Sequence, residues 1–366
     1  MEEKYYLALL HSLGITQKKM RVIFGENLLE GERSYKEFYE KVDYKTLYSF
    51  WVKKNEIENI LKRKKTVKLE FIQKKLEARE VKIITIRDEE YPEELKNISN
   101  SPYIMYVRGK LLEGPKIAVV GARKISSYGK KVIEHIVPEV ARYFPIVSGW
   151  AFGCDTWAHN EALKSWNTTI SVVGTSICED YPTGNKKMYD EIVEKGWAVL
   201  SIFPVWVPWN AYNFPIRNEI VAGLSVWILV VEAKHRSGSL ITAKLALDLW
   251  KDLFAIPWEI FKSNSAGCND LIRNGEAKPV SESAHILEEY NCKNLVENSE
   301  KKSSEKIKFE SEIEQNIYNA LLLEALSSDD LAQKLDIDIS TLSFTLSMLE
   351  IKGLIRKTMW GLFELK

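Results

Sequence analysis

Gly121 and Arg123 lie in a stretch whose residue types could hold a phosphate group. VVGARKISSYGKK, residues 119–131, ends an apolar run with a glycine and leads through small and hydroxyl residues into a predicted helix. Backbone N–H groups at a helix start bind anions, and a guanidinium group can make two hydrogen bonds to one phosphate. The spacing matches neither GxGxxG nor the P-loop, because Lys131 replaces the hydroxyl residue that would hold magnesium. The candidate phosphate-binding residues of this stretch are Gly121, Arg123, Ser126 and Gly129.

A second polar stretch, SGWAFGCDTWAH, follows another apolar run and begins with Ser148 and Gly149. Asp155 and His159 are one helical turn apart, so they could act as an acid–base pair or simply stabilise the start of a helix. Ser148 lacks the G-x-S-x-G elbow of a nucleophile, and the sequence offers no third catalytic member. The pattern therefore favours the structural interpretation.

A third stretch, FPIRNEIVAGLS, places Phe214, Arg217 and Asn218 before a predicted helix. An aromatic ring beside an arginine is the minimal set for an unpaired nucleic acid, since bases stack and phosphates pair with the cation. The FP dipeptide fits a corner of the core equally well. SGSLITA and SAGCNDLIRNGEA add two further junctions with small polar residues.

The elements that must position these stretches are short apolar runs alternating with helical segments from about 116 to 290, among them KIAVVGA, TISVVGT and VWILVVEA. Continuous apolar runs of this kind predict parallel strands covered on both faces. We therefore expect an α/β, Rossmann-like, doubly wound and mainly parallel sheet, with ligands at the carboxyl ends of its strands. Five polar junctions along one sheet edge favour an extended polyanion over a single nucleotide.

The rest of the chain predicts smaller units on either side. Residues 1–80 read as an N-terminal helical domain, in which SLGITQKKMRVIF resembles half of a helix-hairpin-helix within a SAM-like or helix-hairpin-helix-like unit. Residues 81–290 form the extended Rossmann-like domain, and the polar segment 291–310 reads as a linker. Residues 311–366 predict three short helices and a β-wing, the organisation of a winged-helix domain.

Composition excludes several classes of protein. The 51 basic and 51 acidic residues balance, so any basic surface must be local. The four cysteines are too far apart for a zinc site or a disulfide scaffold. The start lacks an apolar signal core and no uncharged run approaches a membrane span, so we expect a cytoplasmic protein that makes no membrane contact.

The ordered set VVGARKISSYG, SGWAFGCDTWAH, GTSICEDYP, FPIRNEIVAGLS, VVEAKHRSGSLITA and SAGCNDLI resembles the motifs of the DNA processing protein A family, DprA or Smf. The resemblance implies a protein without established catalysis or cofactor that binds single-stranded DNA. It further implies displacement of single-strand-binding protein, loading of RecA recombinase in natural transformation, and a homodimer. The DNA-contacting residues that it implies are Arg123, Phe214 and Arg217. The residues that it implies shape the pocket are Gly121, Ser126, Gly129, Ser148, Gly149 and Asn218.

The chain departs from the family pattern at several positions. Phe152 and Glu219 stand where arginines are common, which removes positive charge near the expected groove. We therefore expect DNA binding that is less electrostatic and more dependent on stacking than is usual in the family, or a specialised role for this member. The other departures are Trp150 for Leu, Cys154 for Ile, Ile202 for Glu and Trp258 for Gly.

The tail from residue 310 carries ten acidic and five basic residues, a net charge of −5. The predicted recognition helix ISTLSFTLSMLEIKG is almost uncharged, whereas a duplex reader needs a basic face. The tail therefore favours protein interaction or self-association over operator binding.

Two other functions remain open on the residues alone. A nucleotide phosphoribohydrolase-like enzyme would share the fold class, but it would carry a PGGxGTxxE signature, which the sequence lacks. A nucleotide-sensing regulator would bind a small ligand at the sheet and operator DNA with the winged helix. Binding to single strands, duplexes and mononucleotides distinguishes these functions.

Overall fold

The computed structural model describes residues 2–25, 34–179, 181, 186–205, 210–289, 311–321, 326–335, 337–352, 354–357 and 361–365. The chain divides into two units, Met1–Asn291 and Cys292–Lys366. The predicted linker, 291–310, lies outside the described residues.

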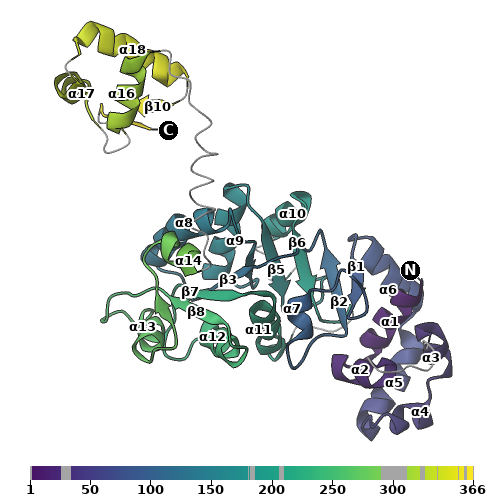
Figure 1. Ribbon diagram of the computed structural model, residues 1–366. Coiled ribbons are helices and arrows are strands. Elements are labelled where there is room, and N and C mark those ends of the chain that lie inside the picture. The colour runs from purple at the N-terminus through teal and green to yellow at the C-terminus, as the bar shows by residue number, and fades with distance from the viewer. Residues whose placement is uncertain are drawn as a thin grey trace. The chain divides into compact units, whose positions relative to one another are not determined.

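The first unit begins with a group of short helices (Figure 1). Their bounds are α1 Glu2–Leu13, α2 Gln17–Phe24, α3 Tyr35–Lys41, α4 Tyr44–Ser49, α5 Lys54–Thr66 and α6 Leu69–Glu77. Side-chain caps help to define their starts: the Thr16 hydroxyl accepts from the Lys19 N–H, and the Asp43 carboxylate from the Thr46 N–H. Apolar residues of these helices share one buried cluster with Tyr103, Ile104 and Tyr106 of the neighbouring sheet. The helices are thus packed onto the sheet edge, and the predicted domain boundary at residue 80 stays a prediction.

The sheet confirms the Rossmann-like expectation. Its strands are β1 Lys82–Thr85, β2 Ile104–Arg108, β3 Ile117–Val120, β4 Ile146–Ser148, β5 Thr169–Val173, β6 Ala198–Ser201, β7 Trp227–Val230, β8 Asp252–Ala255 and β9 Lys278–Pro279. In space they follow the order β1-β2-β6-β5-β4-β3-β7-β8-β9. From β6 to the end of that order at β9, each strand pairs in parallel with its neighbour. Strand β2 instead pairs antiparallel with both β1 and β6.

The winding direction changes at β3. The chain proceeds from β3 through β4 and β5 to β6 on one side, then returns to pair β7 with the other side of β3. The loops that leave the carboxyl ends of β3 and β7 therefore diverge to opposite faces of the sheet. Ligands bind at such a switch point in open α/β sheets.

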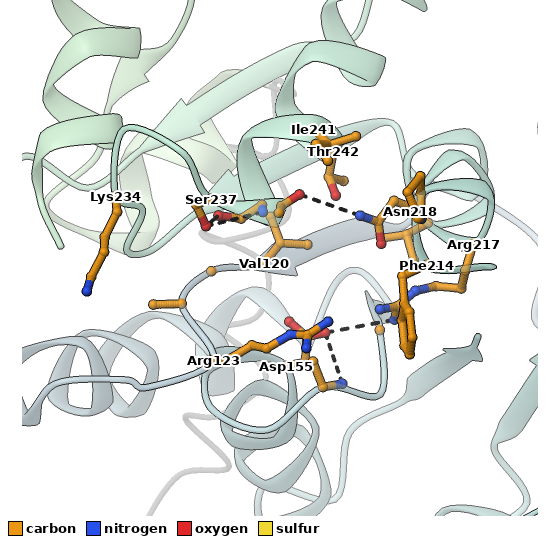
Figure 2. A pocket seen from close by; sticks show the side chains of 18 of the residues that line it. Val120, Arg123, Asp155, Phe214, Arg217, Asn218, Lys234, Ser237, Ile241 and Thr242 are labelled. Carbon is orange, nitrogen blue, oxygen red and sulfur yellow. Dashed lines mark hydrogen bonds and ion pairs between the residues drawn. The ribbon is translucent and has the colours of Figure 1, made fainter. Parts of the chain in front are cut away.

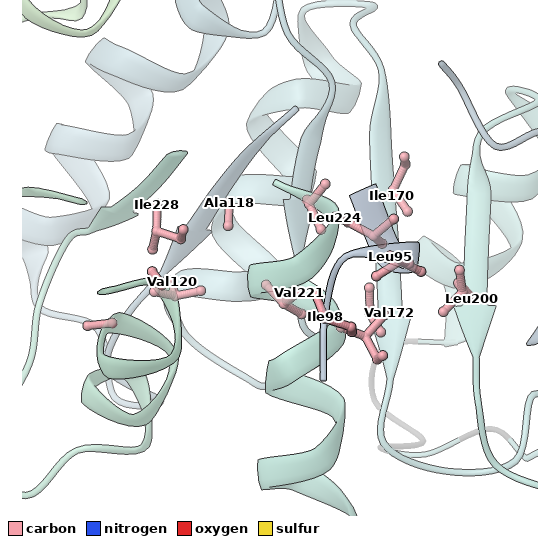
Figure 3. Close-up of a cluster of buried hydrophobic side chains, with 14 of the residues drawn as sticks. Leu95, Ile98, Ala118, Val120, Ile170, Val172, Leu200, Val221, Leu224 and Ile228 are labelled. Carbon is pink, nitrogen blue, oxygen red and sulfur yellow. The ribbon is translucent and has the colours of Figure 1, made fainter. Parts of the chain in front are cut away.

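Helices cover both faces of the sheet (Figure 1). Their bounds are α7 Glu93–Lys96, α8 Ser127–Val140, α9 Cys154–Lys164, α10 Lys186–Glu194, α11 Asn213–Leu224, α12 Gly238–Asp248, α13 Ala266–Arg273 and α14 Ser283–Glu289. Figure 3 shows the core between α7, α11 and the strands, where Leu95, Ile98 and Val221 meet Val172 and Ile170. These side chains are almost wholly withdrawn from solvent, so the hydrophobic effect fixes the helices against the sheet.

The second unit has the winged-helix organisation that the sequence predicts. It contains α16 Glu312–Leu321, α17 Ser328–Leu335, α18 Ile339–Ile351 and the antiparallel pair β10 Ile355–Lys357 and β11 Phe363–Leu365. Ser327 and Asp330 form a reciprocal cap before α17, since each side chain accepts from the other residue's N–H at 3.2–3.3 Å. Leu331, Leu342 and Leu349 belong to a buried cluster that is separate from those of the first unit.

Two expectations from composition can be compared with the described residues. Cys154, Cys178 and Cys268 are buried and free, and Cys292 lies outside the described part. None of the described helices is long and apolar enough to cross a membrane.

Candidate functional site

A basin of about 620 Å³ opens at the carboxyl ends of β3, β4 and β7, at the switch point of the sheet. Arg123 and Lys124 follow β3, Lys234 and Arg236 follow β7, and Arg217 comes from α11. Among the described residues that line this cationic basin, Asp155 is the one carboxylate. Five cations against one carboxylate give a strongly positive local potential in a chain whose net charge is zero.

Arg217 is the cation at the floor of the basin. It is 4 % exposed, its Nη1 donates to the carbonyl of Val172 at 3.0 Å, and its Nη1 lies 3.9 Å from Asp155 Oδ2. Its Nε has no hydrogen-bond partner among the described residues. Burial lowers the pKa of Arg217 and raises that of Asp155, while the attraction between the two groups opposes both shifts. Arg217 therefore brings a positive charge to the floor of the basin.

Gly149 makes this position of Arg217 possible. A Cβ on residue 149 would lie 1.6 Å from Arg217 Nη1 and 2.4 Å from Asp155 Oδ2. The absence of a side chain there lets the guanidinium pass over the loop after β4. Gly149 thus shapes the basin, as the resemblance implied, by leaving room for Arg217.

The Phe214 ring lies near two guanidinium groups, and Figure 2 shows it beside Arg217 with Arg123 opposite. The Arg123 guanidinium carbon lies 5.4 Å from the ring centroid, and that of Arg217 lies 5.9 Å from it. Both distances are in the range of a cation–π interaction. Phe214 is half-buried and Arg123 is exposed, so a ligand can reach the ring and the outer cation together.

The start of α12 opens into the basin. Ser237 caps the helix by accepting from the Ser239 N–H at 3.4 Å, and Ser237, Gly238 and Ser239 all line the basin. Asn218 Nδ2 reaches the Gly238 carbonyl at 3.5 Å (Figure 2). The positive end of the helix dipole and the side chains of Lys234 and Arg236 thus face the same space.

The start of α8, where the sequence predicts an external phosphate, is occupied by the chain's own Glu232. The Ser126 N–H donates to Glu232 Oε2 at 3.1 Å, the Ser126 hydroxyl donates to Oε1, and Asn264 Nδ2 donates to Oε2 at 3.0 Å. The Gly129 N–H in turn donates to Ser126 Oγ at 3.0 Å. Glu232 is fully buried, so an internal carboxylate takes the place of the expected anion.

Asp155 and His159 do not face each other as an acid–base pair. His159 Nε2 lies 2.8 Å from the Gly149 carbonyl, and Nδ1 lies 2.7 Å from the Thr169 hydroxyl. Since the carbonyl only accepts, Nε2 donates and Nδ1 accepts. Burial lowers the pKa of His159 to about 4, so the ring is neutral at pH 7. The structural interpretation of this pair is the one that the geometry supports.

The structure brings together six of the nine residues expected at the site. Gly121, Arg123, Gly149, Phe214, Arg217 and Asn218 line the basin. Ser126, Gly129 and Ser148 do not: the first two belong to the Glu232 cluster, and the buried Ser148 hydroxyl donates to the Val119 carbonyl at 2.6 Å. A role in DNA binding for these three stays a prediction.

Sequence reasoning did not select the cations Lys124, Lys234 and Arg236. The signal was present, since Lys234 and Arg236 directly follow an apolar run in VVEAKHRSGS and Lys124 adjoins Arg123. Charged residues after a strand are common, and only the fold shows that these two loops meet.

The departures at Glu219 and Ile202 lie away from the basin. Glu219 accepts from Asn100 Nδ2 at 3.1 Å and, with Ile202, lines a different cavity of about 750 Å³ beside α1 and α2. Glu219 thus does not line the basin, and its expected effect on DNA binding stays a prediction. Phe152, the other position, borders the basin at Arg123.

No cluster of potential metal ligands occurs among the described residues. The described site thus offers cations, helix-start N–H groups and an aromatic ring, which suit a phosphate-bearing ligand.

Comparisons with known proteins agree with this chemistry. Residues 82–291 match the family DNA recombination-mediator protein A, and residues 302–358 match the DprA winged helix domain. The chain is 40 % identical to the DNA processing protein DprA of Streptococcus pneumoniae over 208 residues, which are 56 % of this chain and 73 % of that protein. It is 39 % identical to the protein Smf of Escherichia coli over 209 residues, 56 % of each chain.

Two solved structures are similar to the fold. The X-ray structure of DNA processing protein A from Streptococcus pneumoniae has a TM-score of 0.67 and 33 % identity, covering 78 % of this chain and 97 % of that chain. The DNA processing protein A of Helicobacter pylori, whose structure concerns its single-stranded DNA binding mode, has a TM-score of 0.52 and 27 % identity, covering 59 % and 97 %. The chain therefore belongs to the DNA recombination-mediator protein A family, DprA or Smf.

Proposed function

We propose that this protein binds single-stranded DNA in the cationic basin and acts as a recombination mediator that loads RecA onto the strand, breaking no bond itself. The observation that carries the proposal is the lining of the basin, where five cations and the start of α12 face one space that holds a single carboxylate among its described lining residues. Guanidinium and ammonium groups and the N–H groups of a helix start all bind phosphate oxygens. The relative from Helicobacter pylori, characterised by its single-stranded DNA binding mode, supports the same ligand.

The arrangement of the cations supports a strand over a mononucleotide. Arg123 and Lys124 come from the loop after β3, whereas Lys234 and Arg236 come from the loop after β7, and all four are exposed. Successive phosphates of an unpaired strand can contact different loops at once. Phe214 offers a ring for a base between them, in the combination that single-strand binders use.

An equilibrium titration tests the ligand. We expect a fluorescent oligo-dT to bind the full chain more tightly than a duplex of equal length, and mononucleotides to compete weakly. The affinity should fall as salt increases, since phosphate contacts release counterions. Tight mononucleotide retention with a preference for duplex would instead indicate a nucleotide-sensing regulator, and turnover of a mononucleotide would indicate an enzyme.

Arg123→Ala tests the basin directly. We expect the affinity for oligo-dT to fall about tenfold or more, because a charge-assisted phosphate contact contributes roughly 1.5–3 kcal/mol. The measurement is the dissociation constant by fluorescence polarisation at fixed salt.

Arg142→Ala is the matched control. Arg142 is exposed and follows α8 at the end remote from the basin, so its removal takes away the same charge elsewhere. Equal dissociation constants for the wild type and a folded Arg123→Ala variant would show that Arg123 does not contribute to binding.

The proposals that this protein loads RecA and forms a homodimer rest on its membership of the family, and each needs its own measurement. RecA-dependent ATP hydrolysis on DNA coated with single-strand-binding protein should start earlier in the presence of this protein, and the Arg123→Ala variant should lose most of that effect. Light scattering over a range of concentrations should give twice the chain mass. An unchanged lag, or the mass of a monomer at all concentrations, would contradict the corresponding part.

A further inference from the structure

Phe152 and Tyr181 lie at a second cavity next to the cationic basin. They line a small cavity of about 60 Å³ together with Trp150, and the same cavity is lined by Arg123, Phe214 and Arg217 of the cationic basin. The aromatic cavity therefore adjoins the basin, and the ring of Phe214 lines both.

The two outer rings are open to solvent. Phe152 is 52 % exposed and Tyr181 is 42 % exposed, whereas Trp150 below them is buried. Large apolar side chains that stay this exposed beside a charged cavity can contact a ligand there.

The loop that carries Phe152 is held in place. The Ala151 N–H donates to Asp155 Oδ2 at 3.3 Å, the Thr156 hydroxyl donates to the Ala151 carbonyl at 2.8 Å, and the Cys154 N–H donates to the Ala122 carbonyl at 3.1 Å. Trp150 anchors the loop from below by packing edge-on against Tyr189, with 5.5 Å between the ring centroids. These contacts hold the backbone that carries Phe152, so less conformational entropy is lost when the loop meets a ligand.

We propose that Phe152 and Tyr181 form a base-stacking shelf, on which unpaired bases of the strand lie while the strand's phosphates occupy the cationic basin. This proposal rests on the proposed function, the binding of single-stranded DNA. Phe152 and Tyr181 are not among the nine residues that the sequence predicts for the site. Uncharged aromatic rings stack with nucleobases and do not attract phosphate, so the occupant is a base. Because Arg123 lines both cavities, a phosphate at Arg123 and a base on the shelf can belong to adjacent nucleotides of one strand.

Base removal separates stacking from phosphate binding. The dissociation constants of the full-length wild type and of Phe152→Ala are measured for oligo-dT and for an abasic oligonucleotide of equal length and charge. We expect Phe152→Ala to weaken binding of oligo-dT about fivefold or more and to leave binding of the abasic strand unchanged. Phe152→Tyr should retain the wild-type affinity for both.

The salt dependence gives a second readout. The slope of log affinity against log salt should be the same for wild type and Phe152→Ala, because no phosphate contact is lost. Phe152→Arg should steepen the slope by about 0.7, the value for one added phosphate contact on a single strand. Phe261→Ala is the control, since Phe261 is 87 % exposed and lines neither cavity.

The outcomes separate the two proposals. If wild type binds oligo-dT and the folded Phe152→Ala variant binds it equally well, or loses the same factor on both oligonucleotides, the shelf is wrong and the basin remains. If wild type binds neither strand, the proposed function is wrong and the shelf falls with it. Equal thermal unfolding midpoints for wild type and variant establish that the variant is folded.

Discussion

Arg217 and His159 take their roles from the same loop. Gly149 lacks the side chain that would block Arg217, and the Gly149 carbonyl accepts the hydrogen bond from His159. Arg217 is thereby held at the basin floor, while His159 is fixed as a neutral internal group. Two residues that could both do chemistry are thus separated into one that lines the basin and one that supports the loop.

The buried histidines predict an acid-sensitive fold. Burial lowers the pKa of His159 to about 4 and that of His11 to about 3, against 6.5 when unfolded. Between pH 6.5 and these lower values the unfolded chain binds protons and the folded chain does not, so the free energy of unfolding falls as pH falls. We expect a loss of about 2 kcal/mol for each histidine between pH 7 and pH 5, measured by urea unfolding.

His159→Gln gives the control for this pH dependence. The variant should lose about 2 kcal/mol less than wild type over the same pH interval, whatever its stability at pH 7. In the folded wild type, the NMR resonances of the His11 and His159 rings should not titrate between pH 7 and pH 5. A ring that titrates near pH 6.5 would contradict the burial argument.

At the scale of elements, α8 and α12 start in similar sequences but face different partners. Both begin with a serine cap after a parallel strand, at Ser126 and Ser237. Glu232 fills the start of α8, whereas the start of α12 opens into the basin among Lys234 and Arg236. Helix dipole and capping are local properties, so the availability of a helix start for a ligand depends on what another strand brings beside it.

The end of α12 carries a second local feature. Trp250 has φ = 56° and is 96 % exposed, and the Lys251 N–H donates to the Ala246 carbonyl at 3.0 Å, which closes a Schellman turn. Glycine usually occupies this left-handed position, since a Cβ is unfavourable there.

We expect Trp250→Gly to raise the free energy of unfolding by about 0.5–1 kcal/mol, because the relief of the backbone outweighs the flexibility that glycine adds to the unfolded chain. Thermal or urea unfolding measures the change. Trp166→Gly is the comparison: Trp166 has the same turn with φ = 55°, but Lys195 lies 4.8 Å from its ring, so its gain should be smaller. Destabilisation by Trp250→Gly would show that the exposed ring contributes more than the turn costs.

At the scale of the whole molecule, the positive charge is concentrated in one unit. The chain is neutral overall, the tail from residue 310 has a net charge of −5, and all residues of the basin belong to Met1–Asn291. The outward side of α18 exposes Ile339 and Phe344 and no described basic side chain before Lys352. A surface of this kind agrees with the expectation that the winged helix contacts protein rather than duplex DNA, which stays a prediction.

The separate cores predict that the first unit is sufficient for single-strand binding. A chain ending at Asn291 keeps its buried clusters and the basin, whereas the second unit has a cluster of its own. We expect the truncated protein to bind oligo-dT with a dissociation constant within about twofold of the full chain at equal salt, since its phosphate contacts are unchanged. Polarisation and thermal unfolding provide the comparison. A tenfold loss of affinity in a folded truncated protein would place part of the DNA site in the second unit.

The sequence by itself determined the elements and most of the chemistry. Continuous apolar runs such as KIAVVG and VWILVV specified buried parallel strands, and Arg123, Phe214 and Arg217 stood out because phosphate and base binding require those residue types. These are short-range signals, carried by residues a few positions apart.

Only the tertiary structure decided which polar groups meet. It placed Glu232 at the start of α8 and turned Glu219 toward Asn100. It also gathered Lys234 and Arg236 opposite Arg123. In each case the residues that meet are about 100 positions apart in the chain. The physical reason is that a parallel sheet brings the ends of distant strands to one edge, while the residue pattern of each loop says nothing about which other loop lies beside it.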